Sequence, residues 1–414
     1  MTRFKLRPPL FLLLLDICGF GSFLLMTNDS VIRKDALISA LVFFGAVMLI
    51  YILMTAFKLG DVYLYLIASF LVSIGLIMLF RIDYQTFGRK QTAWFFIGLG
   101  LFLISYVFMR FIKIWDRLLV FYAAMTFVLF LITLIFGENI KGAKNWIKIG
   151  ALTIQPSEII KIFYVFTIAC FISKKTPENH FFNTVRFGFK TGDLLLSAYV
   201  YGCVGFFAIL NEWGTALLFF LTYFAAMFIY DKSLKLVLVN GVMSAFIGIL
   251  GYFFTDQIST RVHIWLDPWK DMQGKSYQIA QSLFAIVSGG FFGSGLGQGS
   301  PASIPESHSD FIFSAICEEM GLFTGIAIIM CYFIFTYRGV KIALKTNNDF
   351  YKAVAILLTT VFGFQTFIII GGVIKMIPLT GITLPFVSYG GSSIISSFIM
   401  LGIMAAISST EKNL

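Results

Sequence analysis

The 414-residue sequence has few charged residues, few prolines and almost no histidine. Charged residues make up 13% of the chain, against about 25% in soluble domains, which excludes a water-soluble globular protein. The five cysteines stand singly inside apolar segments, and there are only three histidines. We therefore expect neither a disulfide framework nor a structural zinc site.

Apolar and aromatic residues are present in excess. Hydrophobic residues make up 58% of the chain, and the mean hydropathy is +0.89. Apolar segments recur at a length of about 20 residues, which is enough to cross a hydrocarbon layer about 30 Å thick. We predict an all-α polytopic integral membrane protein with about twelve transmembrane helices. The predicted spans lie near residues 10–26, 36–57, 62–80, 92–109, 118–136, 157–173, 194–210, 214–230, 234–254, 311–336, 353–374 and 391–408.

The formal net charge is +10, and the basic residues are dispersed among short loops instead of forming a stripe. This distribution indicates contact with anionic membrane lipids and control of topology, and it argues against nucleic-acid binding. With the amino terminus inside, the cytoplasmic loops hold about 18 basic residues against about 12 outside. We therefore predict cytoplasmic termini and a long extracytoplasmic loop near residues 255–310.

The first unusual segment contains Trp146 and Lys148, and then Glu158 and Lys161 where a predicted span begins. Glu158 and Lys161 stand three residues apart on one helix face, at a depth where ionisable groups are functional or tightly paired. A structural ion pair is the more common outcome, and a substrate contact is the alternative. Trp146 is as consistent with an interfacial anchor as with a platform for a sugar ring.

The long polar segment contains Arg261, then Gln278, Gln281 and Ser282, and ends in a glycine-rich run over residues 288–299. No strand is predicted before the glycine-rich run, which argues against a nucleotide-binding loop. The glycines either expose backbone amides to a phosphate or allow a tight path buried in protein. The second interpretation is favoured.

Acidic side chains gather where the polar segment enters the next predicted span. Glu306, His308 and Asp310 precede the span, and Glu318 and Glu319 follow inside it. An acid at the boundary can complement a helix amino terminus, whereas the two deeper acids must face protein, a cation or water instead of lipid. We therefore predict a polar cavity bordered by Glu306, His308 and Asp310.

The last unusual segment, residues 375–392, contains Lys375, Thr380, Ser388 and Tyr389 among two prolines and several glycines. Proline has no backbone N–H and interrupts a helix, so a continuous helix is excluded. The physical alternative at membrane depth is a re-entrant loop that lines a cavity.

Taken together, the motifs resemble the SEDS family (shape, elongation, division and sporulation). The resemblance covers about residues 60–408, so the spans in residues 1–60 look additional to a ten-helix SEDS-like bundle in residues 61–414. Two positions depart from the family pattern: Asn145 stands where the family usually has arginine, and Glu212 where it tends to have aspartate. The matching residues include Trp146, Gln155, Pro156, Ser157, Glu158, Lys161, Gly214, Thr215, Tyr277, Gln278, Gln281, Ser282, Glu306, His308, Asp310, Glu318, Glu319, Pro378, Gly381, Pro385, Ser388 and Tyr389.

The resemblance implies a peptidoglycan glycosyltransferase that polymerises lipid II into β-1,4 glycan strands at the outer face of the bacterial cytoplasmic membrane. Its role would lie in cell elongation, division or sporulation, with a class B penicillin-binding protein as transpeptidase partner. An α-linked donor that gives a β-linked product requires inversion by a single displacement. A carboxylate near the water boundary suits the general base, which assigns that role to Asp310.

The resemblance also implies substrate contacts and a positive charge for the departing pyrophosphate. Lys375, Lys161, Arg261 and a divalent cation (Mg²⁺ or Mn²⁺) are open alternatives for that charge. The remaining acids, Glu212, Glu318 and Glu319, are expected to be structural or to line the cavity. The expected substrate-binding residues are Trp146, Lys148, Glu158, Lys161, Arg261, Gln278, Gln281, Ser282, Glu306, His308, Lys375, Thr380, Ser388 and Tyr389.

Two other functions fit the same features. A lipid II flippase would also need a polar cavity, broken helices and intramembrane acids, although no inverted repeat is visible between the two halves of the sequence. A non-catalytic scaffold of the cell-wall machinery would need the fold without the chemistry of Asp310.

Overall fold

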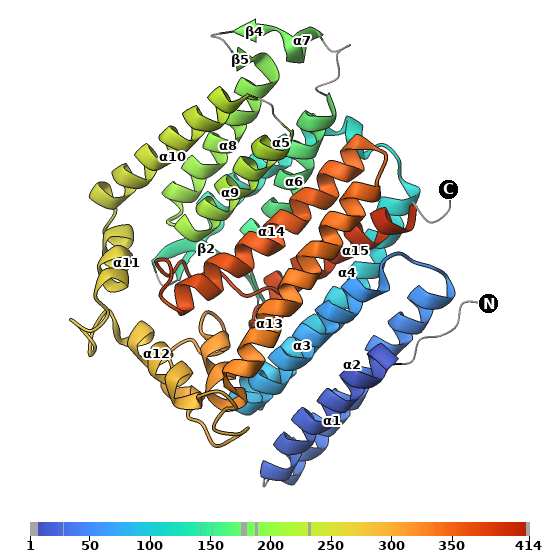
Figure 1. Cartoon of the computed structure of the whole chain (residues 1–414), viewed down its shortest axis with the longest axis vertical. Helices are drawn as coiled ribbons and strands as arrows, with labels where there is room; N and C mark the ends of the chain where they lie inside the picture. Colours follow the sequence, from blue (N-terminus) through green and yellow to red (C-terminus); the bar gives the residue numbers. More distant parts are fainter. Residues whose placement is uncertain are drawn as a thin grey trace. The chain divides into compact units, whose positions relative to one another are not determined.

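The computed structural model describes residues 7–27, 29–140, 142–150, 152–174, 180–186, 189–230 and 233–410 (Figure 1). The chain divides into two compact units. The first unit comprises Met1–Arg110, Ile264–Arg338 and Ile369–Leu414, and the second comprises Phe111–His263 and Gly339–Ile368. In the described part, 11 helical stretches are long and apolar enough to cross a membrane, which confirms a mostly helical polytopic protein.

One of these stretches, Val62–Phe111, contains two helices. Helix α3 (Val62–Asp83) and helix α4 (Arg89–Phe111) are separated by the π-helical turn η1 (Tyr84–Gly88). Asp83 has an extended backbone, and its carboxylate accepts a hydrogen bond from the amide of Thr86 at 2.9 Å, which ends one helix and starts the turn. The count of twelve spans stays a prediction.

Helix α3 is the central element of the first unit and is buried over most of its length. It contacts α1 (Arg7–Met26), α2 (Ser30–Ala56) and α15 (Gly391–Thr410). Asp61 caps α3 by accepting from two amides of its first turn, and its carboxylate also pairs with Arg338 of α13 (Ile312–Lys345) at 2.6 Å. The apolar composition of α3 follows from this position, since protein covers its faces.

Helix α13 matches a predicted span, but it is interrupted at Gly321. Gly321 has φ 82° and ψ 164°, and a Cβ at this position would lie 2.4 Å from Gly293 N. Only glycine fits both the backbone angle and this close approach. The interruption places Glu318 and Glu319 at the end of the first helical part.

The second unit contains α5 (Leu119–Phe136), α6 (Pro156–Lys174), α8 (Thr191–Ile209), α9 (Trp213–Tyr230), α10 (Leu234–Phe254) and most of α14 (Asp349–Val373). Helix α5 packs along α6, and α8 packs along α9. The hydroxyl of Tyr164 in α6 donates to the carbonyl of Phe219 in α9 at 2.7 Å, which satisfies a buried polar group and joins two spans. The unit also has the short elements η2 (Trp115–Arg117), α7 (His180–Asn183), β4 (Val185–Arg186) and β5 (Phe189–Lys190).

A small antiparallel sheet, which the all-α prediction missed, precedes α6. Its strands β1 (Glu138–Ile140), β2 (Ala143–Ile149) and β3 (Leu152–Ile154) lie in the order β1-β2-β3. Gly142 and Gly150, which flank β2, have φ of 87° and 64°. Glycines with positive φ between short antiparallel strands are typical of hairpin turns.

We predicted a long loop near residues 255–310, and the structure shows that this segment also contains short helices. It contains α11 (Asp256–Leu266), α12 (Tyr277–Gly289) and the short helix η3 (Pro301–Ser303). Apolar residues such as Ile279 and Ala280 of α12 are buried, whereas Gln278 is exposed. These helices are amphipathic, so a search for long apolar runs does not detect them.

Candidate functional site

Asp310 lies in the loop of residues 304–311, which leads into α13 in the first unit. Two backbone amides close the loop on the carbonyl of Glu306: Ser309 N donates at 3.0 Å and Phe311 N at 3.2 Å. Glu306 has φ 58°, a conformation uncommon for a residue other than glycine. Its Oε2 accepts from Ser309 Oγ at 3.0 Å. The loop is thus held in one conformation, with Asp310 half-buried at its end.

The segment that follows α14 is hydrogen-bonded to this loop. Tyr389 N donates to His308 O at 2.9 Å, and Ser388 Oγ donates to Ser309 O at 2.7 Å. Gln91 of α4 donates to Ser388 O at 3.1 Å from a buried position. Hydrogen bonds therefore join two segments about 80 residues apart in sequence, residues 304–311 and residues 388–389, next to Asp310. The predicted residues Glu306, His308, Ser388 and Tyr389 all come together here.

The rings of Phe87, His308 and Tyr389 form a cluster at these joined segments. The ring of Phe87, in η1, stacks on His308 with centroids 4.0 Å apart and an interplanar angle of 11°. Tyr389 meets Phe87 edge-on at 5.1 Å. Burial raises the pKa of Tyr389, so its hydroxyl stays a hydrogen-bond donor at neutral pH. Flat rings beside polar groups are suited to a sugar ring.

Sequence reasoning missed Phe87 and Gln91. Phe87 is one of 49 phenylalanines, so no pattern distinguishes it. Gln91 carried a usable signal, because it is a polar residue near the start of an apolar helix. Its amide group bonds Ser388 O and also accepts from Gly390 N at 3.2 Å.

Glu318 and Glu319 bind the glycine-rich segment of residues 290–299 and Ser300, the residue that follows it. Glu318 Oε1 accepts from Ser300 N at 2.7 Å, and Glu319 Oε2 accepts from Gly297 N at 3.0 Å. Arg81 of α3 lies 3.1 Å from Glu319 Oε1. The two acids therefore hold the segment that leads to Asp310.

Three predicted residues of the first unit lie on α12. Ser282 is fully buried, and its hydroxyl lies 2.7 Å from that of Ser314 in α13. Gln281 is half-buried on the same helix. Ser282 joins α12 to α13, whereas Gln278 is exposed.

Lys375 and Thr380 lie in the irregular segment between α14 and α15, as the prolines predicted. Lys375 has φ 61°, and its carbonyl accepts from Trp265 Nε1 at 3.2 Å. Thr380 is half-buried. This irregular segment belongs to the same unit as Asp310.

In the second unit, Glu158 and Lys161 form the ion pair that their spacing predicted. Lys161 Nζ lies 2.8 Å from Glu158 Oε2 and 3.0 Å from Oε1 of Gln365 in α14. The side chains of Lys161 and Glu158 are only 3% and 8% exposed. The pair therefore links α6 to α14 and satisfies the buried charges.

The sheet carries Trp146 and Lys148. Trp146 is half-buried on β2 opposite Glu138, and Lys148 Nζ lies 2.7 Å from Glu138 Oε2. Both members of this pair are about half exposed, so solvent weakens their attraction.

The predicted residue Arg261 lies on α11, where it is half-buried.

The two departures from the family pattern meet in one buried cluster. Glu212 accepts from Gln155 Nε2 at 3.0 Å and from Ser157 Oγ at 3.2 Å, and Asn145 adds a third hydrogen bond. Burial raises the pKa of Glu212, and these bonds oppose that rise. Glu212 thus joins the sheet, the start of α6 and the α8–α9 turn.

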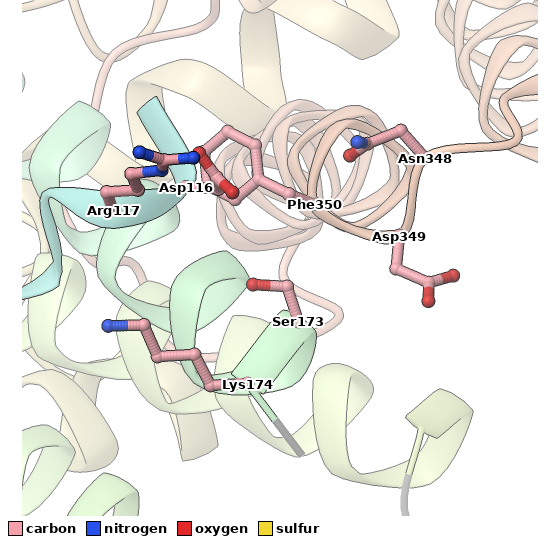
Figure 2. A pocket seen from close by; sticks show the side chains of 7 residues that line it. All are labelled: Asp116, Arg117, Ser173, Lys174, Asn348, Asp349 and Phe350. Carbon is pink, nitrogen blue, oxygen red and sulfur yellow. The ribbon is translucent and has the colours of Figure 1, made fainter. Parts of the chain in front are cut away.

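A separate cavity of about 370 Å³ lies in the second unit (Figure 2). Residues from η2, the end of α6 and the start of α14 line it, with two cations and two carboxylates among them. No residue predicted for the site is in its lining. The lining residues are Asp116, Arg117, Ser173, Lys174, Asn348, Asp349 and Phe350.

Among the described residues, no three His, Cys, Asp or Glu side chains converge.

The sequence profile of the FtsW, RodA and SpoVE family, described as cell cycle protein, matches residues 61–413. Peptidoglycan glycosyltransferase RodA of Mycobacterium tuberculosis is 32% identical over 364 residues, which cover 83% of this chain and 76% of that protein. Stage V sporulation protein E of Bacillus subtilis is 31% identical over 366 residues, covering 84% of this chain and 96% of that protein.

A solved structure described as "Structural coordination of polymerization and crosslinking by a peptidoglycan synthase complex" has the same fold. Its TM-score is 0.69 at 22% identity, over 85% of this chain and 98% of that chain. The fold and the motif segments thus define a multi-pass membrane protein of the SEDS class. The chain belongs to the FtsW, RodA and SpoVE family.

Proposed function

We propose that this protein is a peptidoglycan glycosyltransferase that polymerises lipid II into β-1,4 glycan strands at the outer face of the bacterial cytoplasmic membrane. Family membership and the names of the relatives support this function. The observation that carries it is the Asp310 loop, held by hydrogen bonds from Ser388 and Tyr389 beside the Phe87–His308 stack.

In the proposed reaction, Asp310 accepts the proton of the 4-hydroxyl of an acceptor GlcNAc. The acceptor oxygen forms a bond to the anomeric carbon of the lipid-linked MurNAc, and the bond from that carbon to the undecaprenyl pyrophosphate breaks. A single displacement inverts the anomeric centre, so no glycosyl-enzyme forms. Rigid placement of the base reduces the entropy lost at the transition state.

The departing pyrophosphate needs a positive charge, and Lys375 is the proposed source. The ammonium of Lys161 is already bound by Glu158 and Gln365, so moving it would leave a buried carboxylate unpaired. Lys375 belongs to the same unit as Asp310 and is half-buried in an irregular segment. A cation placed there stabilises charge that develops on the leaving group.

The proposed topology places both termini in the cytoplasm and the Asp310 loop outside. The bias of Lys and Arg toward the same set of loops supports this orientation. A class B penicillin-binding protein is the proposed transpeptidase partner, and the peptidoglycan synthase complex of the same fold supports it. We also propose residues 1–60 as an addition to the SEDS-like domain of residues 61–414.

The test is polymerisation by the purified chain with its penicillin-binding protein partner and labelled lipid II in detergent. We expect glycan strands, resolved by length on a gel and degraded by muramidase. The partner alone is the control and should give no strands. The absence of strands, together with movement of labelled lipid II across liposomes, would support a flippase and contradict the proposal.

A scaffold role makes a different prediction for cells. If the chain only recruits other proteins, Asp310→Asn should support growth of a deletion strain as well as the native chain does. The proposed enzyme requires that this variant fail to complement while it is still present in the membrane.

A further inference from the structure

The hairpin of α1 and α2 lies outside the residues matched by the family, yet it is attached to the core of the first unit (Figure 1). The carboxylate of Asp16 in α1 accepts a hydrogen bond from the hydroxyl of Ser73 in α3, and both residues are buried. Gly19 lies so close to α3 that a Cβ would be 2.3 Å from Ile77 Cδ1. An acid inside an apolar helix is retained where it has a specific partner, so this contact fixes the position of α1 on α3.

Aromatic contacts continue the attachment along the hairpin. The rings of Phe20 and Phe80 lie edge-to-face at 5.2 Å, and the rings of Phe43 in α2 and Phe95 in α4 are 4.8 Å apart. Such contacts hold the hairpin on α3 and α4 in addition to the Asp16 bond. The hairpin is therefore a fixed part of the first unit.

The last residue of α1, Met26, reaches the glycine-rich segment before Asp310. A Cβ on Gly297 would lie 1.6 Å from Met26 Cε, so the thioether packs directly on this glycine. Two hydrogen bonds join Gly297 to α3 and α13. Its carbonyl accepts from Arg81 Nη2 at 3.2 Å, and its amide donates to Glu319 at 3.0 Å.

We propose that Met26 is a positioning residue for glycosyl transfer. Met26 contacts Gly297 in addition to Arg81 and Glu319. It thereby helps to hold the segment of residues 290–299 and the Asp310 loop that follows. The N-terminal hairpin is then part of the catalytic apparatus in addition to being a membrane anchor. This inference rests on the proposed function, because its effect on turnover requires that the chain be the polymerase.

The contact is tested first without reference to activity. Hydrogen exchange of residues 294–300 is compared in the native chain, in Met26→Ala and in Leu25→Ala. Leu25 is the matched control, since it precedes Met26 and is 85% exposed. We expect Met26→Ala to speed exchange in this segment by roughly tenfold, with no change in Leu25→Ala. Unchanged exchange in Met26→Ala would overturn the inference, whatever the activity of the chain.

The second measurement is polymerisation kinetics of the same variants. A displaced base lowers kcat more than KM, and we expect kcat of Met26→Ala to fall by about tenfold to a hundredfold. Met26→Leu, which restores the apolar volume, should regain most of the rate. Faster exchange with unchanged kcat would overturn the positioning role and leave the proposed function intact. If the native chain forms no polymer, the proposed function fails instead.

Discussion

Replacement of Asp310 by asparagine should lower kcat for glycan polymerisation by about 10²–10⁴-fold, the usual contribution of a general base. Asparagine has nearly the shape of aspartate but cannot take the proton of the acceptor hydroxyl. The surrounding loop is held by hydrogen bonds of Ser309, Phe311, Ser388 and Tyr389, which the substitution leaves in place. The variant should therefore fold normally and still bind lipid II.

Two further variants test whether the loss of activity comes from the position of the Asp310 carboxylate or from the loss of any negative charge in this segment. Asp310→Glu keeps a carboxylate in a displaced position and should retain part of the activity. Asp271→Asn removes an exposed acid of the same polar segment and should leave kcat unchanged. A fully active Asp310→Asn enzyme would remove the base role from this residue.

Replacement of Lys161 by methionine should destabilise the protein by about 3–5 kcal/mol, because it leaves the buried Glu158 carboxylate without its cation. Lys161 contacts Glu158 at 2.8 Å and Gln365 at 3.0 Å, so its loss also weakens the link from α6 to α14. The measurement is the midpoint of thermal unfolding in detergent, followed by intrinsic fluorescence.

The double variant Glu158→Gln/Lys161→Met is the matched test of this explanation. It removes both charges and should recover most of the lost stability, since replacing a buried pair as a whole is far less harmful than breaking it. Lys148→Met breaks an exposed ion pair with Glu138 and should cost only about 0–1 kcal/mol. Equal losses for Lys148→Met and Lys161→Met would contradict the explanation from burial.

Much of the fold could be predicted because membrane spans are long and apolar. The pairing of Glu158 with Lys161 was also predictable, since residues three apart share a helix face and buried charges need partners. The sheet before α6, the helices α11 and α12 and the break at Gly321 were not. These elements are short or amphipathic, or they depend on contacts distant in sequence, such as the approach of Gly321 to Gly293.

The candidate site was only partly predictable for the same reason. Glu306, His308 and Asp310 are adjacent in sequence, and their unusual composition identifies them. The hydrogen bonds from Ser388 and Tyr389 to this loop depend on tertiary structure, so no local sequence pattern predicts them. Phe87 and Met26 are ordinary apolar residues whose importance comes only from what they touch.

The assignment of Asp310 to the glycosyl-transfer site is tested most directly by labelling residue 310 itself. In a chain whose five native cysteines are replaced by alanine, Asp310→Cys is exposed to a membrane-impermeant maleimide added outside intact spheroplasts. We expect modification from the outside and protection when the purified variant is saturated with lipid II. Modification only after the membrane is permeabilised, or labelling that lipid II does not slow, would contradict the assignment of Asp310 to the glycosyl-transfer site.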